Sequence, residues 1–140
     1  MKRFSLVLLV LLLSTVSAWS ASTKGGYNYI SADDVQKRLN SGPAMILVDI
    51  CTVEQFSKGH VASSIETNAY PVKTEPEKAR LAKVLPTIQA SAEDVVIVCP
   101  RGGGGAKNTV DFYKSQGVAE ERLLILDKGM DNWPYDTQSR

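Results

Sequence analysis

The sequence has few of the side chains that bind metals. Its 140 residues include one histidine and two cysteines, Cys51 and Cys99, and the cysteines are not spaced as a CxxC pair. A structural zinc site needs several such ligands at a recognisable spacing. We therefore expect no metal site, and nothing in the sequence implies an organic cofactor.

An excess of charge of one sign is also missing. The chain has 16 basic and 15 acidic side chains, a net charge of +1, and no basic stripe. Proteins that bind nucleic acids usually gather Lys and Arg on one face, so we expect no nucleic-acid partner. With 44% hydrophobic and 22% charged residues, the composition is typical of a globular protein, and the length suits one domain with its own core.

Only the N-terminus contains a long apolar run. Lys2 and Arg3 precede FSLVLLVLLL, and small residues follow it up to Ser20. This is the pattern of a secretory signal peptide, and the run is short for a membrane span. We expect residues 1–20 to be a cleaved signal and residues 21–140 to be a periplasmic or secreted domain, free of the membrane, with 14 basic and 15 acidic side chains. An uncleaved anchor is the alternative.

Apolar runs alternate with helix patterns along the rest of the chain. After a loose entry at residues 19–26, we expect strands at 27–30, 44–50, 63–69, 94–99 and 122–127. We expect helices at 32–39, from 53 to Gly59, from 74 up to Pro86, and at 106–117. This alternation predicts an α/β fold in which a central parallel sheet of about five strands has helices on both faces.

Both cysteines follow predicted strands. In a parallel α/β sheet the working site lies at the carboxyl ends of the strands. Cys51 comes just after the strand at 44–50, and Cys99 ends the strand at 94–99. We therefore expect the two cysteines at the same edge of the sheet.

The segment VCPRGGGGAKN surrounds Cys99 with features that suit a nucleophile. Backbone N–H groups of a tight loop can form an anion-binding nest, and the helix behind it adds its positive end. Both effects favour a thiolate. Glycines let the backbone approach the sulfur closely, and Arg101 and Lys107 could add positive charge. The alternative is that Cys99 is a small core residue.

The segment CPRGGGGAKNTVDFYKSQGV resembles the active-site loop and following helix of rhodanese domains. The family loop commonly reads C-x-x-G-x-R-S/T, and Cys99, Gly102 and Ala106 match its cysteine, glycine and alanine. ILVDICTVEQFSKGHVASSI is similar to the family signature D-V-R-x-x-x-E-F/Y-x-x-G-H-I-x-G-A, and LDKGMDNW is similar to its closing G-G-M-x-x-W segment. The resemblance covers about residues 27–135.

The resemblance implies a sulfurtransferase of a single rhodanese-like domain at residues 21–140. Cys99 would take a sulfane sulfur from thiosulfate, a polysulfide or a thiol persulfide, and pass it from a persulfide to a thiophilic acceptor. The loop has the shorter length typical of the sulfurtransferases rather than that of the related phosphatases. Asp49 and His60 would support the loop. The substrate-binding residues would be those of the loop: Pro100, Arg101, Gly102, Gly103, Gly104 and Gly105.

Two departures from the family pattern bear on substrate and redox chemistry. Gly104 and Gly105 replace the usual Arg and Ser/Thr, so thiosulfate binding would depend on Arg101. Cys51 stands where the family has the Arg of D-V-R. Cys51 is therefore either a redox partner that resolves or locks Cys99, or a buried spectator thiol.

A function of a different class also fits these residues. The chain could be a non-catalytic module that uses the rhodanese fold in the periplasm, to bind a protein partner or to carry sulfur or selenium to it. The loss of the loop arginine favours this alternative, whereas the cysteine and the loop length favour the enzyme. The sequence does not identify such a partner.

Overall fold

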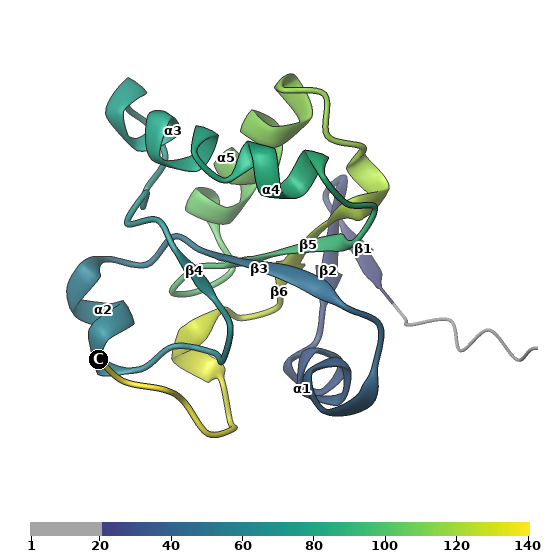
Figure 1. Cartoon of the computed structure of the whole chain (residues 1–140), viewed down its shortest axis with the longest axis vertical. Coiled ribbons are helices and arrows are strands. Elements are labelled where there is room, and N and C mark those ends of the chain that lie inside the picture. The colour runs from purple at the N-terminus through teal and green to yellow at the C-terminus, as the bar shows by residue number, and fades with distance from the viewer. Residues whose placement is uncertain (1–20) are drawn as a thin grey trace, which may run out of the picture.

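The computed structural model describes residues 21–140, so the predicted signal segment lies outside the described residues. Six strands form one sheet in the order β1-β2-β6-β5-β3-β4 (Figure 1). All neighbouring pairs are parallel except β1 and β2. The strands are β1 Ser22–Lys24, β2 Tyr27–Ile30, β3 Met45–Asp49, β4 Ile65–Glu66, β5 Asp94–Val98 and β6 Leu123–Leu126.

Helices connect these strands and cover both faces of the sheet, as expected. Helices α3, α4 and α5 lie on one face, and α1 lies on the other (Figure 1). The helices are α1 Ala32–Ser41, α2 Val53–Lys58, α3 Glu75–Ala82, α4 Leu85–Gln89 and α5 Gly104–Ser115, with short 3-10 turns η1 Glu120–Arg122 and η2 Met130–Asn132. The predicted α/β class with a mostly parallel sheet is confirmed.

Three details of the predicted elements are wrong. The entry segment is not loose, because Ser22–Lys24 pairs antiparallel with β2 around Gly25 and Gly26, whose φ angles are +56° and +82°. The sequence analysis missed this sixth strand because its residues are polar and show no apolar pattern. Pro86 does not end a helix but lies in the first turn of α4, where proline is tolerated because the first amides have no helical partner. The strand expected at 63–69 has only two residues.

Three of the predicted helix starts are confirmed by their caps, whereas the helix expected from residue 106 starts two residues earlier, at Gly104. The Ser31 side chain accepts a hydrogen bond from the Asp34 amide at the start of α1. Thr52 and Thr74 form full capping boxes at the starts of α2 and α3. Such caps stabilise a helix because they satisfy amides that have no intrahelical partner.

Two apolar clusters sandwich the sheet. One lies under α3, α4 and α5 and includes the alternate residues Val95, Ile97 and Cys99 of the β5 segment. The other lies toward α1 and includes Val96 and Val98. The central strands β3, β5 and β6 are almost wholly buried, as expected for parallel strands covered on both sides.

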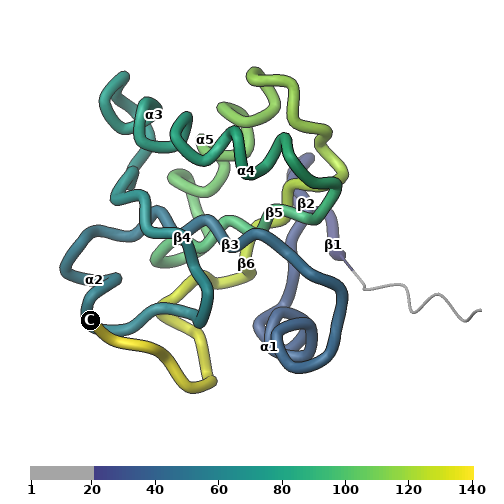
Figure 2. Tube along the Cα trace, viewed as in Figure 1, coloured from purple at the N-terminus to yellow at the C-terminus, as the bar shows by residue number. Residues whose placement is uncertain are grey.

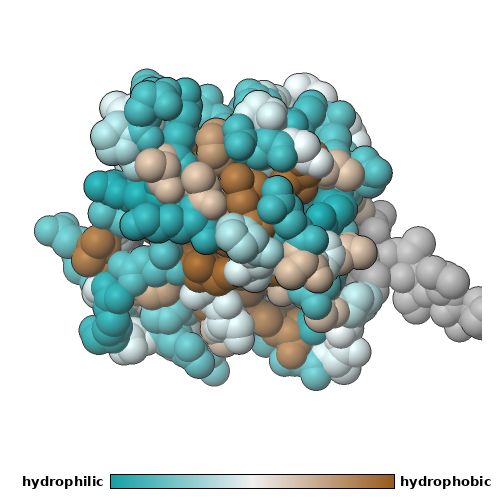
Figure 3. Space-filling view, turned by 45° about the horizontal axis from the view of Figure 1, so that its top comes forward, coloured by the Kyte–Doolittle hydropathy of each residue, from teal (hydrophilic) through white to brown (hydrophobic). Residues whose placement is uncertain are grey.

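The face that Figure 3 shows is mainly hydrophilic. With the layer of α3, α4 and α5 turned forward, hydrophilic side chains dominate and apolar ones gather in a band across the middle (Figure 3). The C-terminal segment returns to α2 (Figure 2), where the Arg140 amide donates to the Ser57 carbonyl at 3.1 Å. Within residues 21–140, none of the helices has the length and apolar character needed to cross a membrane.

Candidate active site

The two cysteines lie at the same edge of the sheet, as the strand pattern predicts. Strands β3 and β5 are direct neighbours, with Asp49 opposite Val98. Beyond the strands, the Ile50 amide donates to the Val98 carbonyl at 2.9 Å. Cys51 and Cys99 follow immediately, and each is only 1% exposed.

The loop after Cys99 is short and folds back on the sulfur. It spans residues 100–103, and α5 begins at Gly104. The Gly102 amide donates a hydrogen bond to Cys99 Sγ at 2.8 Å. Gly102 has a φ of +70°, a left-handed conformation that glycine adopts without the penalty that a Cβ brings. This N–H is the part of the predicted amide cradle that the structure shows in contact with the sulfur.

The four consecutive glycines have different surroundings. A Cβ on Gly105 would lie 2.8 Å from the Tyr70 ring, so this position is closed by packing. At Gly103 and Gly104 a Cβ would meet no atom within 4 Å. The family loop pattern C-x-x-G-x-R-S/T has an arginine at the position of Gly104, where this chain has open space beside the start of α5.

The segment after β6 closes the other side of the loop. The Met130 amide donates to the Cys99 carbonyl at 2.8 Å, and the Asp131 amide donates to the Pro100 carbonyl at 2.9 Å. A Cβ at Gly129 would come within 2.4 Å of the Cys99 carbonyl oxygen, so only glycine permits this approach. Gly129 and Met130 belong to the third family-like segment, and the structure gives that segment a physical role.

Asp49 holds the backbone beside Cys51. Its Oδ1 accepts a hydrogen bond from the Cys51 amide at 2.8 Å. The other oxygen, Oδ2, is buried without a hydrogen-bond partner among residues 21–140, and burial raises the pKa of this carboxyl. Burial raises the pKa of the Cys51 thiol far above its usual range, and the neighbouring carboxyl of Asp49 adds to this effect. Cys51 is therefore a neutral thiol at ordinary pH.

The two cysteine side chains have different surroundings. Cys99 packs in the cluster under α5, with Ala106 and Ile97. Cys51 instead lines a pocket of about 300 Å³ whose other walls include α2, Pro100 and the η2 segment. Both thiols are free in the structure. The redox partnership between them stays a prediction.

His60 has a position that suits support rather than chemistry. Its Nδ1 lies 2.8 Å from the Phe56 carbonyl and donates to it, and its ring stacks on the Phe56 ring with 3.8 Å between centroids. Its amide donates to the Gln138 carbonyl at 2.9 Å. His60 thus fastens the end of α2 to the C-terminal segment.

The two cations that the sequence placed near Cys99 are not equivalent. Arg101 lies in the loop and is exposed. Lys107 is one turn into α5, and its Nζ lies over the Tyr27 ring at 5.6 Å from the centroid. Arg101 is therefore the better placed of the two to meet an anionic substrate at the loop.

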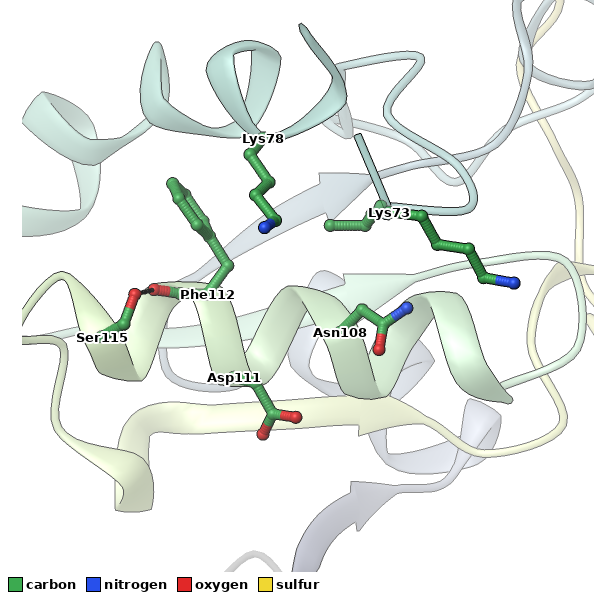
Figure 4. A pocket seen from close by; sticks show the side chains of 7 residues that line it. Lys73, Lys78, Asn108, Asp111, Phe112 and Ser115 are labelled. Carbon is green, nitrogen blue, oxygen red and sulfur yellow. Dashed lines mark hydrogen bonds between the residues drawn. The ribbon is translucent and has the colours of Figure 1, made fainter. Parts of the chain in front are cut away.

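A larger pocket, of about 540 Å³, lies between the segment around Lys73 and helix α5. Figure 4 shows Lys73, Lys78 and Asn108 around it, with the Asp111 carboxylate turned away. That carboxylate accepts a hydrogen bond from the Tyr27 hydroxyl at 2.9 Å. Neither cysteine lines this pocket, so we do not assign it to the site.

The structure is an α/β domain in which Cys99 stands at the carboxyl end of a parallel strand, directly before a short glycine loop. The sequence pattern described as "Rhodanese-like domain" matches residues 31–135. The chain belongs to this family, which includes sulfurtransferases. A search of the curated proteins finds no match.

Solved structures share this fold at low sequence identity. The rhodanese-like domain of a protein from Anabaena sp. is 16% identical, with a TM-score of 0.61 over 80% of this chain and 79% of that one. A thiosulfate sulfurtransferase from Pseudomonas aeruginosa is 17% identical, with a TM-score of 0.59 over 79% of this chain and 19% of that one. An As-Sb reductase from Leishmania major is 19% identical, with a TM-score of 0.56 over 75% and 74% of the two chains. These identities establish the shared fold and not the activity.

Proposed function

We propose that the chain is a sulfurtransferase that carries a sulfane sulfur as a persulfide on Cys99. The observation that supports this most directly is the hydrogen bond from the Gly102 amide to Cys99 Sγ at 2.8 Å. An N–H held against the sulfur stabilises the thiolate before attack and again when the thiolate leaves.

The reaction has two steps. The Cys99 thiolate attacks the outer sulfur of a donor such as a thiol persulfide, the donor S–S bond breaks, and the donor leaves as a thiolate. A persulfide remains on Cys99. In the second step a thiophilic acceptor attacks the outer sulfur of that persulfide, and the Cys99 thiolate is released to the Gly102 amide. Each step exchanges one S–S bond for another and is neither a net oxidation nor a net reduction, so no external oxidant or reductant is needed.

The open space at Gly103 and Gly104 bears on the choice of donor. Thiosulfate carries two negative charges, and Arg101 is the loop cation that could meet them. A thiol persulfide needs less positive charge and fits the glycine loop. We propose that persulfides or polysulfides are better donors than thiosulfate.

The reaction is proposed to occur in the periplasm or outside the cell, because residues 1–20 have the pattern of a secretory signal. The N-terminal sequence of the protein recovered from an exported fraction would test this. A start near residue 21 supports the proposal, and an intact N-terminus in the membrane fraction contradicts it.

The decisive experiment compares the wild type with Cys99→Ala. Sulfur transfer to cyanide is measured with thiosulfate and with a thiol persulfide as donors. Wild-type activity that Cys99→Ala abolishes supports the proposal. If both proteins are inert with every donor, the chain is a non-catalytic module, and equal activity in both would remove Cys99 from the reaction.

Intact mass without reductant, before and after exposure to the donor, adds a second readout. A gain of one sulfur atom in the wild type but not in Cys99→Ala identifies the persulfide. A loss of two hydrogens instead would establish Cys51 as the redox partner of Cys99, and two free thiols throughout would make Cys51 a spectator in redox chemistry.

A further inference from the structure

A pocket of about 530 Å³ lies between α1 and the C-terminal segment, and neither cysteine lines it. Helix α1 and the C-terminal segment are both on the side of the sheet away from α3, α4 and α5 (Figure 1). The lining residues Leu39, Val61 and Trp133 also belong to the apolar cluster on that side of the sheet. The pocket therefore rests on the packed core, and its volume is usual for a small-molecule site.

Two aromatic rings of this pocket are held in place. The rings of Trp133 and Tyr135 meet edge to face, with 5.4 Å between their centroids. The Trp133 Nε1–H donates to the Asp136 carbonyl at 3.2 Å, and the Tyr135 hydroxyl donates to an Asp33 carboxylate oxygen at 2.6 Å. Because their polar atoms are already bonded, the two side chains offer a ligand mainly apolar ring surface in a fixed orientation.

The polar side chains of the lining are mostly neutral amides and hydroxyls, from Gln36, Asn40, Ser63, Thr137 and Gln138. Gln36 Nε2 donates to Asn40 Oδ1 at 3.3 Å. This leaves Gln36 Oε1 and Asn40 Nδ2 without a partner among residues 21–140. An amide carries both donors and acceptors, so this wall of α1 can bond to either end of a hydroxyl group.

The charge of the lining restricts the class of ligand. Asp136 is the single charged residue among those that line the pocket. It is exposed and forms no ion pair within the described chain 21–140. An anionic ligand would find no cation here. A cationic ligand would find one carboxylate and two rings, but it would leave the amides and hydroxyls unused, whereas a neutral ligand rich in hydroxyls uses all of these groups.

Ser63 gives an independent sign of a ligand. In the family signature G-H-I-x-G-A, Gly59, His60 and Val61 stand at G-H-I, and Ser63 stands at the second glycine. The φ angle of Ser63 is +67°, in the left-handed region where glycine is free of the penalty that a Cβ brings. The chain thus retains a hydroxyl side chain in the pocket at a cost in backbone strain, and such strain is typical of ligand sites.

We propose that this pocket binds a neutral saccharide of one or two rings. The rings of Trp133 and Tyr135 contact the apolar C–H face of the sugar, and the amides of α1 and the Ser63 hydroxyl bond to its hydroxyl groups. The Asp136 carboxylate accepts a further hydrogen bond at the edge of the pocket. No covalent step is involved, and the site is independent of the sulfur transfer proposed for Cys99.

The first test uses Trp133 as a local reporter of binding. The other tryptophan of the chain is Trp19, so Trp19→Phe in the full chain isolates the fluorescence of Trp133. Maltose, cellobiose, lactose and diacetylchitobiose are titrated to millimolar concentrations, with calorimetry alongside, and glucuronate and choline serve as anionic and cationic probes. A saturable signal with at least one disaccharide supports the proposal. No signal with any of the four, or tighter binding of choline or glucuronate, overturns it.

Three substitutions test the roles given to single side chains. Ser63→Gly should weaken saccharide binding about fivefold, the effect of one lost hydrogen bond, without lowering the thermal stability, because glycine suits the φ angle at this position. Tyr135→Leu should weaken binding about tenfold through the loss of a ring contact. Asp136→Asn should change the affinity by no more than about twofold, since asparagine keeps an accepting oxygen. A complete loss of binding in Asp136→Asn would indicate a site for cations and contradict the proposal.

Asn68→Gly is the matched control for Ser63→Gly. Asn68 also has a positive φ, of +52°, and does not line this pocket, so its substitution should leave the affinity unchanged. Equal losses in the two variants would show a general backbone effect and overturn the role of Ser63. Cys99→Ala should bind the same saccharide with wild-type affinity. Absence of saccharide binding therefore leaves the Cys99 reaction intact, and absence of sulfur transfer leaves this site intact.

Discussion

Gly102 meets three demands at one position. Its φ of +70° favours glycine, its amide donates to Cys99 Sγ, and a Cβ would lie 3.0 Å from the Leu126 carbonyl oxygen. A side chain there would disturb the backbone that holds the sulfur. The persulfide chemistry that we propose therefore depends on this residue through its lack of a Cβ.

Gly102→Ala should lower the rate of persulfide formation at least tenfold and cost about 1–2 kcal/mol of stability, because alanine is strained at this φ. Gly117→Ala is the control, since Gly117 also has a positive φ, of +89°, but a Cβ there meets no atom within 4 Å. Gly117→Ala should lower the stability but leave the rate of persulfide formation unchanged. Denaturant unfolding and intact mass after a timed exposure to persulfide measure the two effects, and equal sulfur loading in both variants would contradict the role given to Gly102.

Cys51 shows how a single substitution changes the site at the residue scale. The family pattern places a permanent cation at this position, whereas this chain has a thiol that burial and the Asp49 carboxyl keep protonated. The site therefore loses one fixed positive charge at the pocket that Cys51 lines. This change agrees with a substrate that is neutral overall rather than an anion such as thiosulfate.

At the scale of elements, the short helices α2 and α3 begin with the same type of cap but lie in different parts of the molecule. Helix α2 carries Gln55 and Lys58 into the pocket beside Cys51, and its capping box is built on Thr52. Helix α3 has the same kind of box on Thr74 and lies in the layer of α4 and α5, away from α2 (Figure 1). The two caps form a matched pair for a test.

Thr52→Ala and Thr74→Ala should each cost about 1 kcal/mol of stability, the usual loss for an N-cap threonine. Only Thr52→Ala should also lower the rate of sulfur transfer, because it loosens the helix that follows Cys51 at the site edge of the sheet. Thermal unfolding and acceptor kinetics distinguish the two effects. The same loss of rate in both variants would show that general loosening, and not α2, controls the reaction.

A comparison of predicted and observed elements shows which helices and strands the sequence patterns could locate. The cap signals and apolar runs located α1, α2, α3, α5 and the buried strands, because these signals are local. The β1 hairpin was missed since its strand, Ser22–Lys24, is polar and exposed. Helix α4 was missed because Pro86 permits a helix start as well as a helix end.

At the scale of the whole molecule, two buried acids couple folding to pH. Cys51 lies at the sheet edge and Tyr113 lies under α3, where its hydroxyl donates to the Leu81 carbonyl at 3.1 Å. Burial raises the pKa of both groups above their ordinary values of 9.0 and 10.0. Between those values and the higher folded ones, the folded chain binds more protons than the unfolded chain, so stability falls as pH rises.

We expect constant stability from these two groups below pH 9 and a decline above it. Each group contributes a slope of up to about 1.4 kcal/mol per pH unit once its unfolded form ionises. Cys51→Ala should move the onset of this decline from about pH 9 toward pH 10, where Tyr113 begins to act. Urea unfolding at a series of pH values measures this, and an identical pH profile for the wild type and Cys51→Ala would refute it.

The sequence by itself determined the alternation of strands and helices, the caps, and the placement of both cysteines at strand ends. It did so because apolar periodicity, caps and turn residues act over a few neighbouring positions. The resemblance to the rhodanese pattern followed from local segments as well. These features suggested a thiol nucleophile before any distance was known.

Only the tertiary structure decided what surrounds each thiol. The Gly102 hydrogen bond depends on the fold of the loop, and the pocket that contains Lys58 and Asp131 exists because α2 and η2 meet across the sheet edge. Those residues are 73 positions apart in the chain, and no local pattern relates them. The neutral state of Cys51 likewise follows from burial, which is a property of the packed molecule and not of the residue.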